Sequence, residues 1–475
     1  MSTAPASTPA AASDPPRWTL AAAAEAIGAR LSGADGPFAG VTTDSRGDCR
    51  DRLFIALRGV RFDGHDYVAE AAANGAIAAL VEQALDDDPL PQLIVADSRL
   101  ALGRLAAAWR DRIAARVIAI TGSNGKTTVK EMLAAILAQV GPTRATEGNL
   151  NNDIGMPLTL LGARDERFLI LEMGANHHGE IGYLTEIARP DVALITNAGR
   201  AHLEGFGSVE GVAHAKGEIA RGLPADGTFV FMADVPWTPL WQDLAEARPT
   251  LSFGTGPNAQ VHADEQAITQ TWDADGFRSH FRAMIHGAEL EIALPLAGSH
   301  NVRNALAAIA GATALGIDPA AIRAGLERLH PVARRLQPRR ARNGAKLLDD
   351  SYNANPDSLA AAVDVLTALP LPSDGRHLLV LGDFGELGAD SVEVHHEMGV
   401  AARAAGASAL YALGPLSTHA VAGFGEGARH FTDQHRLIET LRAETGPADV
   451  LLIKGSRRAA MDRVADALCT DREEH

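Results

Sequence analysis

The chain has 475 residues, a formal net charge of −16, and 46% hydrophobic and 21% charged residues. At about 100 to 200 residues per domain, this length predicts two to four domains, and we expect three. The acidic balance argues against unspecific binding to DNA, RNA or anionic lipid, because those partners need a basic surface. An anionic substrate would therefore need a locally basic pocket.

The N-terminal segment, the cysteine content and the hydropathy of the sequence favour a cytoplasmic protein. Residues 1–17 have neither a basic start nor an apolar stretch, so we expect a disordered tail rather than a secretion signal or membrane anchor. Cys49 and Cys469 lie near opposite ends of the chain, which is neither a disulfide framework nor a metal cluster and favours a reducing compartment. No window approaches the roughly 20 consecutive apolar residues of a spanning helix. We expect no membrane insertion, no nucleic-acid partner and a monomer.

Three α/β domains are predicted. Residues 18–113 mix short strands with alanine-rich helices, the pattern of a small α/β domain. In residues 114–316, apolar strands alternate with helices, which predicts a parallel sheet with ligands beyond the carboxyl ends of its strands. Within it, residues 259–294 indicate a β-meander, either an insertion or an edge of that sheet. The alternation restarts in residues 317–475, where we expect a Rossmann-like domain.

A phosphate-binding loop stands at residues 121–128 (TGSNGKTT), between a predicted strand and a predicted helix. Gly122 and Gly125 allow the tight turn in which backbone N–H groups and a helix N-terminus face an anion. Lys126 supplies a charge for the outer phosphates, and Thr127 a hydroxyl for Mg²⁺. The loop therefore predicts ATP binding.

Candidate metal ligands follow the next strands of the predicted sheet. Glu172 ends one strand at the same sheet edge as the phosphate loop, where a carboxylate can hold Mg²⁺ on the phosphates. His202 comes after the next strand, although histidine is an uncommon Mg²⁺ ligand. Lys216 would by itself be an ordinary solvated helix lysine. Each residue is a weak signal alone, and their joint order is the informative feature.

That order resembles the Mur ligase family, ATP-dependent enzymes that form amide bonds in peptidoglycan precursor synthesis. The resemblance runs from about Leu20 to the end of the chain and includes a shortened phosphate loop, with Ile120 where the standard motif has a glycine. The motifs that follow in the expected order are Glu172, N-A-x-x-A-H-L at 197–203, A-K-G-E-I at 215–219, G-S-H-N-V-R-N-A at 298–305, Arg335-Leu336 and D-D-S-Y-N-A-N-P at 349–356.

Within the family, the chain resembles the members that add D-alanyl-D-alanine to UDP-N-acetylmuramoyl-tripeptide. The stretches that carry this resemblance are residues 148–159 (GNLNNDIGMPLT), 172–175, 202–208 and 350–355. The tripeptide-forming members share T-D-S-R, here residues 43–46, but normally carry a D-N-P-R motif that the last domain lacks. The resemblance implies that ATP converts a carboxylate into an acyl phosphate, which an amine then attacks. This chemistry needs positioning and charge neutralisation rather than a protein nucleophile.

The resemblance also implies a nucleotide site with two Mg²⁺ ions. Thr127 would hold the first ion, Glu172 would bridge both, and His202 would ligate the second together with Lys216 as a carbamate. The family usually has glycine where Arg334 stands, and we assign the contact to the γ-phosphate to Arg335. Domain closure would then assemble the site. The implied ATP-binding residues are Gly122, Ser123, Asn124, Gly125, Lys126, Thr127, Thr128, Asn301 at adenine, Arg335, and Asp350 at ribose.

Contacts to the other substrates are implied in the same way. Ser45 and Arg46 of the first domain would bind the UDP-sugar, with a capped turn and a surface arginine as the alternative. The third residue of the tripeptide, diaminopimelate or lysine, stays open. The remaining implied contacts are Asn149, Asn151 and Asn152 along the tripeptide channel, and Asn353 and Asn355 at D-alanyl-D-alanine.

Two other patterns do not predict a site. Residues 383–385 spell Asp-Phe-Gly, the metal-binding triplet of protein kinases, but no kinase glycine loop accompanies it, and we interpret it as a strand end. The adjacent histidines at 177–178 and 395–396 lack companions at metal-ligand spacing, and we expect them to be solvated.

Two alternative functions stay open at this point. One is another ligase of the superfamily, such as the tripeptide-forming or folate-polyglutamate enzyme, which residues 148–159 and 350–356 argue against. The other is a nucleotide-binding regulator or scaffold without catalysis. The joint presence of Glu172, His202 and Lys216 argues against it, because a binding module has no need of a second metal site.

Overall fold

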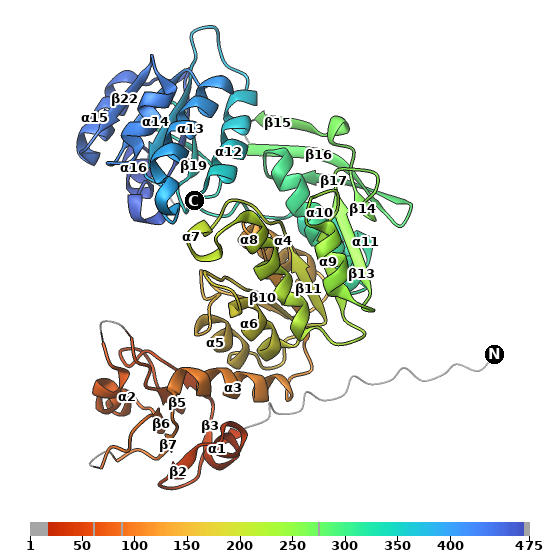
Figure 1. The fold of residues 1–475 in the computed structure, drawn as a ribbon, viewed down its shortest axis with the longest axis vertical. Coiled ribbons are helices and arrows are strands. Elements are labelled where there is room, and N and C mark those ends of the chain that lie inside the picture. The colour runs from red at the N-terminus through yellow and green to blue at the C-terminus, as the bar shows by residue number, and fades with distance from the viewer. Residues whose placement is uncertain (1–17, 60–61, 87–88, 274–275, 470–475) are drawn as a thin grey trace, which may run out of the picture. The chain divides into compact units, whose positions relative to one another are not determined.

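The computed structural model describes residues 18–59, 62–86, 89–273 and 276–469. The chain divides into two compact units, residues 1–115 with 153–167 and residues 116–152 with 168–475. Both are layered α/β structures (Figure 1). The tail predicted at residues 1–17 lies outside the described residues.

The first unit is built on a five-stranded sheet of order β2-β7-β6-β5-β4, in which β2 runs antiparallel to β7 and the other pairs are parallel. Helix α1 begins after Thr19, whose side chain accepts the Ala22 N–H, and ends at Gly28 in the left-handed region. A separate pair joins β1 to β3. The bounds are β1 Trp18–Thr19, α1 Leu20–Ile27, β2 Arg30–Ser32, β3 Pro37–Phe38, β4 Gly40–Thr42, β5 Arg52–Ile55, α2 Val68–Ala73, β6 Ala78–Val81, β7 Gln92–Ile94 and α3 Ser98–Arg110.

Residues 153–167 also belong to the first unit, although in sequence they lie between two strands of the second. They contain helix α5 (Gly155–Leu161), which contacts α3. Trp109 Nε1 donates to the Ala163 carbonyl at 3.0 Å, and Arg164 Nη2 donates to the Ala39 carbonyl at 2.6 Å. These side-chain bonds connect residues 54 and 125 positions apart, so periodicity along the chain could not predict this placement.

The second unit contains a ten-stranded sheet of order β15-β16-β14-β13-β12-β11-β8-β10-β9, with β17 paired to β16. The strands from β9 to β14 in that order are parallel, whereas β14, β15 and β17 pair antiparallel with β16. The predicted meander is therefore an edge of the same sheet. The bounds are β8 Arg116–Thr121, β9 Thr143–Ala145, β10 Phe168–Glu172, β11 Val192–Ile195, β12 Thr228–Met232, β13 Thr250–Gly254, β14 Val261–His262, β15 Thr269–Asp273, β16 Gly276–Ile285 and β17 Ala288–Leu294.

Helices α4, α10 and α11 share a buried core with this sheet. A Cβ on Gly325 of α11 would come within 2.4 Å of the Ile136 Cα of α4, so only glycine permits this approach. Ile322 and Leu326 of α11 belong to the same core, which favours a domain limit after α11; the limits predicted at residues 113 and 316 stay predictions. The bounds are α4 Lys126–Leu137, α6 Glu180–Ala188, α7 Leu203–Phe206, α8 Val209–Gly217, α9 Thr238–Ala245, α10 Ser299–Ala314 and α11 Pro319–Glu327.

The C-terminal part of the second unit is a six-stranded sheet of order β18-β19-β23-β20-β21-β22, parallel except for β18 against β19. Leu347 and Leu348 of β19 point into different buried clusters, as expected for a sheet covered by helices on both faces. The bounds are β18 Gln337–Arg340, β19 Lys346–Asp350, α12 Pro356–Ala368, β20 His377–Gly382, α13 Ser391–Ala404, β21 Ala409–Leu413, α14 Ser417–Phe424, β22 Ala428–Phe431, α15 Gln434–Glu444, β23 Val450–Lys454 and α16 Asp462–Leu468. The described part of the chain includes no helix long and apolar enough to cross a bilayer.

Candidate active site

The phosphate loop connects β8 to α4, as predicted. Gly122 and Gly125 have φ angles of 146° and 80°. A Cβ on Gly122 would lie 2.0 Å from Thr196 Oγ1, and a Cβ on Gly125 would lie 2.2 Å from Asn304 Oδ1. Both glycines are therefore required by close contacts as well as by conformation. They leave a cradle at the start of α4 in which an anion can approach the backbone.

Residues after β11 hold this loop in place. The Asn197 carbonyl accepts the Ser123 N–H at 3.1 Å, and Asn197 Oδ1 accepts the Asn124 N–H at 2.9 Å. Thr196 Oγ1 donates to the Asn124 carbonyl at 2.6 Å. Ser123 and Thr128 are buried. The loop backbone is thus fixed by the protein itself, which is the preorganisation that electrostatic catalysis needs.

Lys126, Thr127 and Glu172 converge at the loop. Thr127 Oγ1 donates to Glu172 Oε2 at 3.0 Å, and Lys126 Nζ donates to the Gly122 carbonyl at 2.6 Å. Burial lowers the pKa of Lys126, which the Glu172 carboxylate opposes. Hydroxyl and carboxylate oxygens are the ligands that Mg²⁺ prefers, so these residues fit a magnesium nucleotide. Among the described residues, no group of three or more His, Cys, Asp or Glu side chains is placed so that it could hold a metal ion by itself.

Lys216 is buried, and its alternative reading as a solvated lysine is wrong. Its side chain lies on α8 with Nζ 5.0 Å from the centre of the Phe206 ring, and the residue is 1% exposed. Burial, followed by the charge of Lys126, lowers the pKa of Lys216 to about 7. A substantial fraction of this amine is therefore uncharged at neutral pH.

His202 and Glu386 meet in unusual backbone conformations. Their φ angles are 55° and 63°, in the left-handed region that strains residues with a side chain. His202 Nδ1 lies 2.6 Å from Glu386 Oε2. The hydrogen bond from His202 holds the pKa of the Glu386 carboxyl below its usual value. Glu386 is not among the residues predicted from the sequence, where its only signal is its position shortly after β20.

The two neighbouring arginines have different partners. Arg335 Nη2 donates to Thr127 Oγ1 at 3.0 Å. Arg334 instead pairs with Asp462 and Asp466 of α16, at 2.6 and 3.3 Å. Arg335 is therefore the guanidinium at the phosphate loop. Its contact with a γ-phosphate stays a prediction.

Residues 350–355 contribute further contacts. The Asp350 carboxylate accepts from Lys454 Nζ at 2.5 Å, and burial raises the pKa of Asp350 despite that ammonium. Asn355 Nδ2 donates to Asn124 Oδ1 of the phosphate loop at 2.7 Å. Asn353 is exposed, and its carbonyl accepts from Lys454 at 3.1 Å. A ribose at Asp350 would thus share this carboxylate with Lys454.

Helix α10 approaches the loop through two asparagines. Asn301 is buried, and its amide donates to the Ala297 carbonyl at 2.7 Å. Asn304 Nδ2 donates to Asn301 Oδ1 at 3.2 Å, while its oxygen faces Gly125. Asn304 is not among the predicted site residues, although it lies one helical turn after Asn301. Adenine binding by Asn301 stays a prediction.

Of the three asparagines predicted for the tripeptide channel, Asn151 contacts the candidate metal ligand. Asn151 Nδ2 donates to Glu172 Oε1 at 2.9 Å, and its carbonyl accepts the Gly174 N–H at 2.8 Å. Asn149 and Asn152 are exposed. Asn151 therefore links the predicted channel segment to the nucleotide site.

The predicted UDP-sugar residues lie in a turn after β4. Ser45 is buried, and its hydroxyl donates to Glu70 Oε2 at 2.5 Å. The exposed Arg46 guanidinium pairs with Asp44 at 2.9 Å. This local geometry is the capped turn with a surface arginine, and UDP-sugar binding by the two residues stays a prediction.

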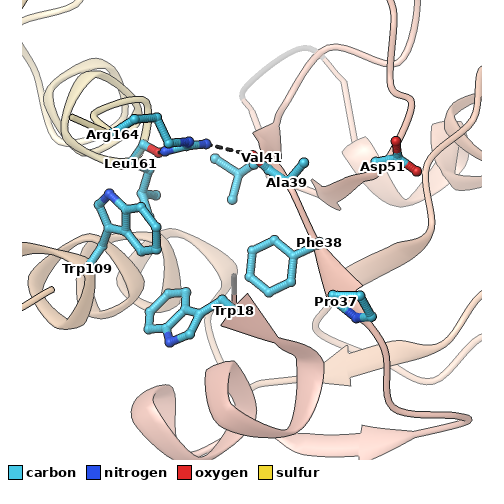
Figure 2. Close-up of a pocket in the computed structure, with 10 residues that line it drawn as sticks. Trp18, Pro37, Phe38, Ala39, Val41, Asp51, Trp109, Leu161 and Arg164 are labelled. Carbon is cyan, nitrogen blue, oxygen red and sulfur yellow. Dashed lines mark hydrogen bonds between the residues drawn. The ribbon is translucent and has the colours of Figure 1, made fainter. Parts of the chain in front are cut away.

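A cavity of about 400 Å³ lies in the first unit. Aromatic side chains of Trp18, Phe38 and Trp109 line it, and Figure 2 shows the Arg164 guanidinium spanning to Ala39. Trp109 Nε1 donates to the Ala163 carbonyl, whereas the buried Trp18 Nε1 has no hydrogen-bond partner in the described structure. The cavity marks the junction of α3 and α5 with β3 and β4.

The prediction that the adjacent histidines are solvated is wrong for His395. His395 is fully buried rather than solvated, because Nδ1 lies 2.6 Å from the Ser391 carbonyl and Nε2 accepts the Phe384 N–H at 3.1 Å. It shapes the segment after β20. Asp383 follows that strand directly, as expected, and its carboxylate accepts the Ser417 N–H at 2.7 Å.

The chain belongs to the Mur ligase family, as the order of its motifs predicts. It matches the Mur ligase family catalytic domain over residues 37–110, the middle domain over 120–312 and the glutamate ligase domain over 334–457. The UDP-N-acetylmuramoyl-tripeptide--D-alanyl-D-alanine ligase of Escherichia coli (strain K12) is 45% identical over 95% of this chain and 98% of its own length. The ligase of the same name from Bacillus subtilis (strain 168) is 36% identical over 90% and 93%.

Solved structures agree with this assignment. Crystal structure I of MurF from Acinetobacter baumannii has a TM-score of 0.88 and 36% identity, covering 96% of this chain and 99% of its own. MurF ligase from Thermotoga maritima in complex with ADP has a TM-score of 0.79 and 28% identity, covering 90% and 96%. The predicted three-domain α/β architecture is confirmed.

Proposed function

We propose that this chain is an ATP-dependent ligase that joins D-alanyl-D-alanine to the C-terminal carboxylate of UDP-N-acetylmuramoyl-tripeptide. The products are ADP, phosphate and the UDP-linked pentapeptide used for peptidoglycan. The observation that carries the proposal is the convergence of Glu172 and Arg335 on Thr127 beside Lys126. Relatives named for this activity are 36 to 45% identical over at least 90% of the chain.

The site is suited to neutralising charge rather than to attacking the substrate. Lys126 and the N–H groups at the start of α4 would bind the outer phosphates, and Arg335 would bring a guanidinium to the transferred group. Thr127 and Glu172 would hold Mg²⁺, which supplies charge stabilisation at the phosphate oxygens when bound. Together these residues would hold the γ-phosphoryl group in line with the substrate carboxylate, whose oxygen attacks it while the bond to ADP breaks. The amine of D-alanyl-D-alanine then attacks the carbonyl carbon of the acyl phosphate, and phosphate leaves.

A second Mg²⁺ is proposed at His202 and a carbamate of Lys216, with Glu172 between the two ions. The burial of Lys216 beside Lys126 supports this modification, because two ammonium groups repel each other where water is excluded. Carbamylation, in which the deprotonated Lys216 amine adds CO₂ and releases a proton, would convert this side chain into an anion. The repulsion would then become attraction to Lys126 and to the metal.

The other substrate contacts rest on the motifs of the family. We propose that Ser45 and Arg46 bind the UDP-sugar, that residues 149–152 face the tripeptide, and that Asn353 and Asn355 position the dipeptide. A cytoplasmic location, a monomer and closure of the last domain onto the nucleotide are part of the same proposal. We place the start of the last domain after α11.

Release of phosphate tests the proposed function. Recombinant enzyme with ATP and Mg²⁺ should release phosphate only when both UDP-N-acetylmuramoyl-tripeptide and D-alanyl-D-alanine are present. Separate reactions with tripeptides ending in lysine or diaminopimelate identify the third residue, and reactions with glutamate or a single amino acid test the other ligases of the superfamily. ATP turnover without either substrate, or none with both, would refute the proposal.

A further inference from the structure

Lysine is rare in this chain, and its side chains are buried or half-buried. Only five of the 43 Lys and Arg residues are lysines, all within the described residues, and none of them is exposed. Arginine is thus the surface cation, and lysine stands where a compact ammonium is required instead of a planar guanidinium. The five are Lys126, Lys130, Lys216, Lys346 and Lys454. Lys130 lies one helical turn after Lys126 and has no role in the mechanism above.

The ammonium of Lys130 binds a main-chain carbonyl. Lys130 is 2% exposed, and its Nζ donates to the Thr146 carbonyl at 2.6 Å. The neighbouring Glu131 carboxylate lies 2.8 Å from Nζ, with a side chain that is 40% exposed. A buried ammonium is retained only where it is bonded and paired. Lys130 therefore connects α4 firmly to the residue that follows β9.

Thr146 stands where the pairing of β9 with β10 ends. Its N–H donates to the Ile170 carbonyl at 2.9 Å, continuing the ladder of the two strands. The next N–H on that side of β10, that of Glu172, donates to Thr146 Oγ1 at 2.9 Å. A side-chain hydroxyl thus takes the place of a strand carbonyl. This bond sets the backbone from which the Glu172 carboxylate projects.

The segment from Thr146 to Asn151 returns to the same glutamate. Asn151 Nδ2 donates to Glu172 Oε1, while Thr127 donates to the other carboxylate oxygen. Both ends of the segment therefore hold Glu172, one by its backbone and one by its side chain. Lys130 fixes the first carbonyl of that segment.

We propose that Lys130 is a positioning residue for Glu172. Its ammonium fixes the Thr146 carbonyl and thereby orients both the Thr146 hydroxyl and the segment that ends at Asn151. The inference rests on the proposed role of Glu172 in holding Mg²⁺. Loss of contacts that orient a metal ligand changes metal affinity or activity by about 10- to 100-fold.

The test is the Mg²⁺ dependence of ADP binding, measured by calorimetry in EDTA and over a range of Mg²⁺ concentrations. In Lys130→Met and Thr146→Val, the Mg²⁺ concentration that gives half of the metal-dependent gain in ADP affinity should rise about 10-fold or more. ADP affinity in EDTA should stay unchanged, because the phosphate loop is intact. Thr146→Ser, which keeps the hydroxyl, should retain the wild-type Mg²⁺ dependence.

Two further variants separate this inference from its assumptions. Thr185→Val removes another buried hydroxyl, which donates to the Ile219 carbonyl at 3.0 Å, and should leave the Mg²⁺ dependence unchanged. Glu172→Gln should shift it at least as far as Lys130→Met. A wild-type response of Glu172→Gln would refute the metal role of Glu172. If the Mg²⁺ dependence changes in Glu172→Gln but not in Lys130→Met or Thr146→Val, the positioning role of Lys130 is overturned while the metal role of Glu172 stands. If Lys130→Met does not fold, the comparison of Thr146→Val with Thr146→Ser decides.

Discussion

The phosphate loop and the turn at residues 43–46 both follow a strand, yet the charged side chains of the turn are held locally, unlike those of the loop. In the loop, Asn124 is bonded to Asn355, 231 residues away, and Thr127 to a glutamate 45 residues away. In the turn, Asp44 accepts the N–H and pairs with the guanidinium of Arg46, two residues away. A site that stabilises developing charge must be rigid before reaction, whereas a site for an unreacting group can form its contacts on binding.

The two regions also differ in the exposure of their charged side chains. Glu172 is 3% exposed, whereas the side chains of Asp44 and Arg46 are 54% and 81% exposed. The hydrogen bond from Arg46 lowers the pKa of Asp44 to about 2. Because this pKa is depressed, the pair is fully formed above the ordinary pKa of 3.8 and is lost only as the pH falls toward 2. At neutral pH a ligand of Arg46 must therefore compete with Asp44.

Removal of the buried lysine should have the largest effect in this comparison. Lys216→Ala should lower kcat by about 10³-fold, because it deletes the proposed carbamate from a site preorganised for charge. A short-chain carboxylate such as acetate should restore part of the rate by entering the vacated space. Steady-state phosphate release with and without acetate measures both effects.

The matched control is Lys346→Ala, since Lys346 lies over the Trp272 ring at 4.6 Å and has no contact with the phosphate loop in the described structure. It should keep wild-type kcat and show no response to acetate. Full activity of Lys216→Ala without any carboxylate would reject the carbamate.

The paired arginines provide the intermediate effect. Arg335→Met should lower kcat by about 10²-fold, because a guanidinium is lost at the phosphate loop. Arg334→Met should retain kcat and show only a lower melting temperature, because Arg334 pairs with Asp462. For both variants, kcat is measured under saturating substrates and the melting temperature by thermal unfolding. If Arg334→Met lowered kcat more than Arg335→Met, the catalytic guanidinium would be that of Arg334.

The exposed turn should give the smallest effect, on binding alone. Arg46→Ala should raise the KM for the UDP-linked substrate about 10-fold, as expected for loss of one charged hydrogen bond, with kcat unchanged. Asp44→Asn weakens the competing pair and should lower that KM. KM values at neutral pH and an intermediate salt concentration test both variants. An unchanged KM in both would remove Arg46 from the substrate site.

Features that depend on neighbouring residues were predictable from the sequence. The spacing of Gly122, Gly125 and Lys126 predicted the loop, and the apolar strand before Glu172 predicted its place at the sheet edge. The choice between Arg334 and Arg335 was not predictable in this way. It depends on the left-handed φ of 61° at Arg334 and on distant partners in α16.

Contacts between residues far apart in sequence account for the rest. Glu386 meets His202, Asn304 closes on Gly125, and residues 153–167 join the first unit, each through side chains that no periodicity along the chain connects. His395 was misread for the same reason, since its burial depends on the segment after β20. Tertiary packing decides such positions.

The scarcity of lysine has a consequence for covalent chemistry on amines. An acylating or aldehyde reagent finds no exposed lysine side chain on the described surface. When it is not carbamylated, Lys216, with its pKa of about 7, is often in the nucleophilic form at neutral pH. Amine labelling would therefore favour the half-buried Lys126 and Lys346 and the low-pKa Lys216, and protection of Lys126 or Lys216 by nucleotide would report occupancy of the site.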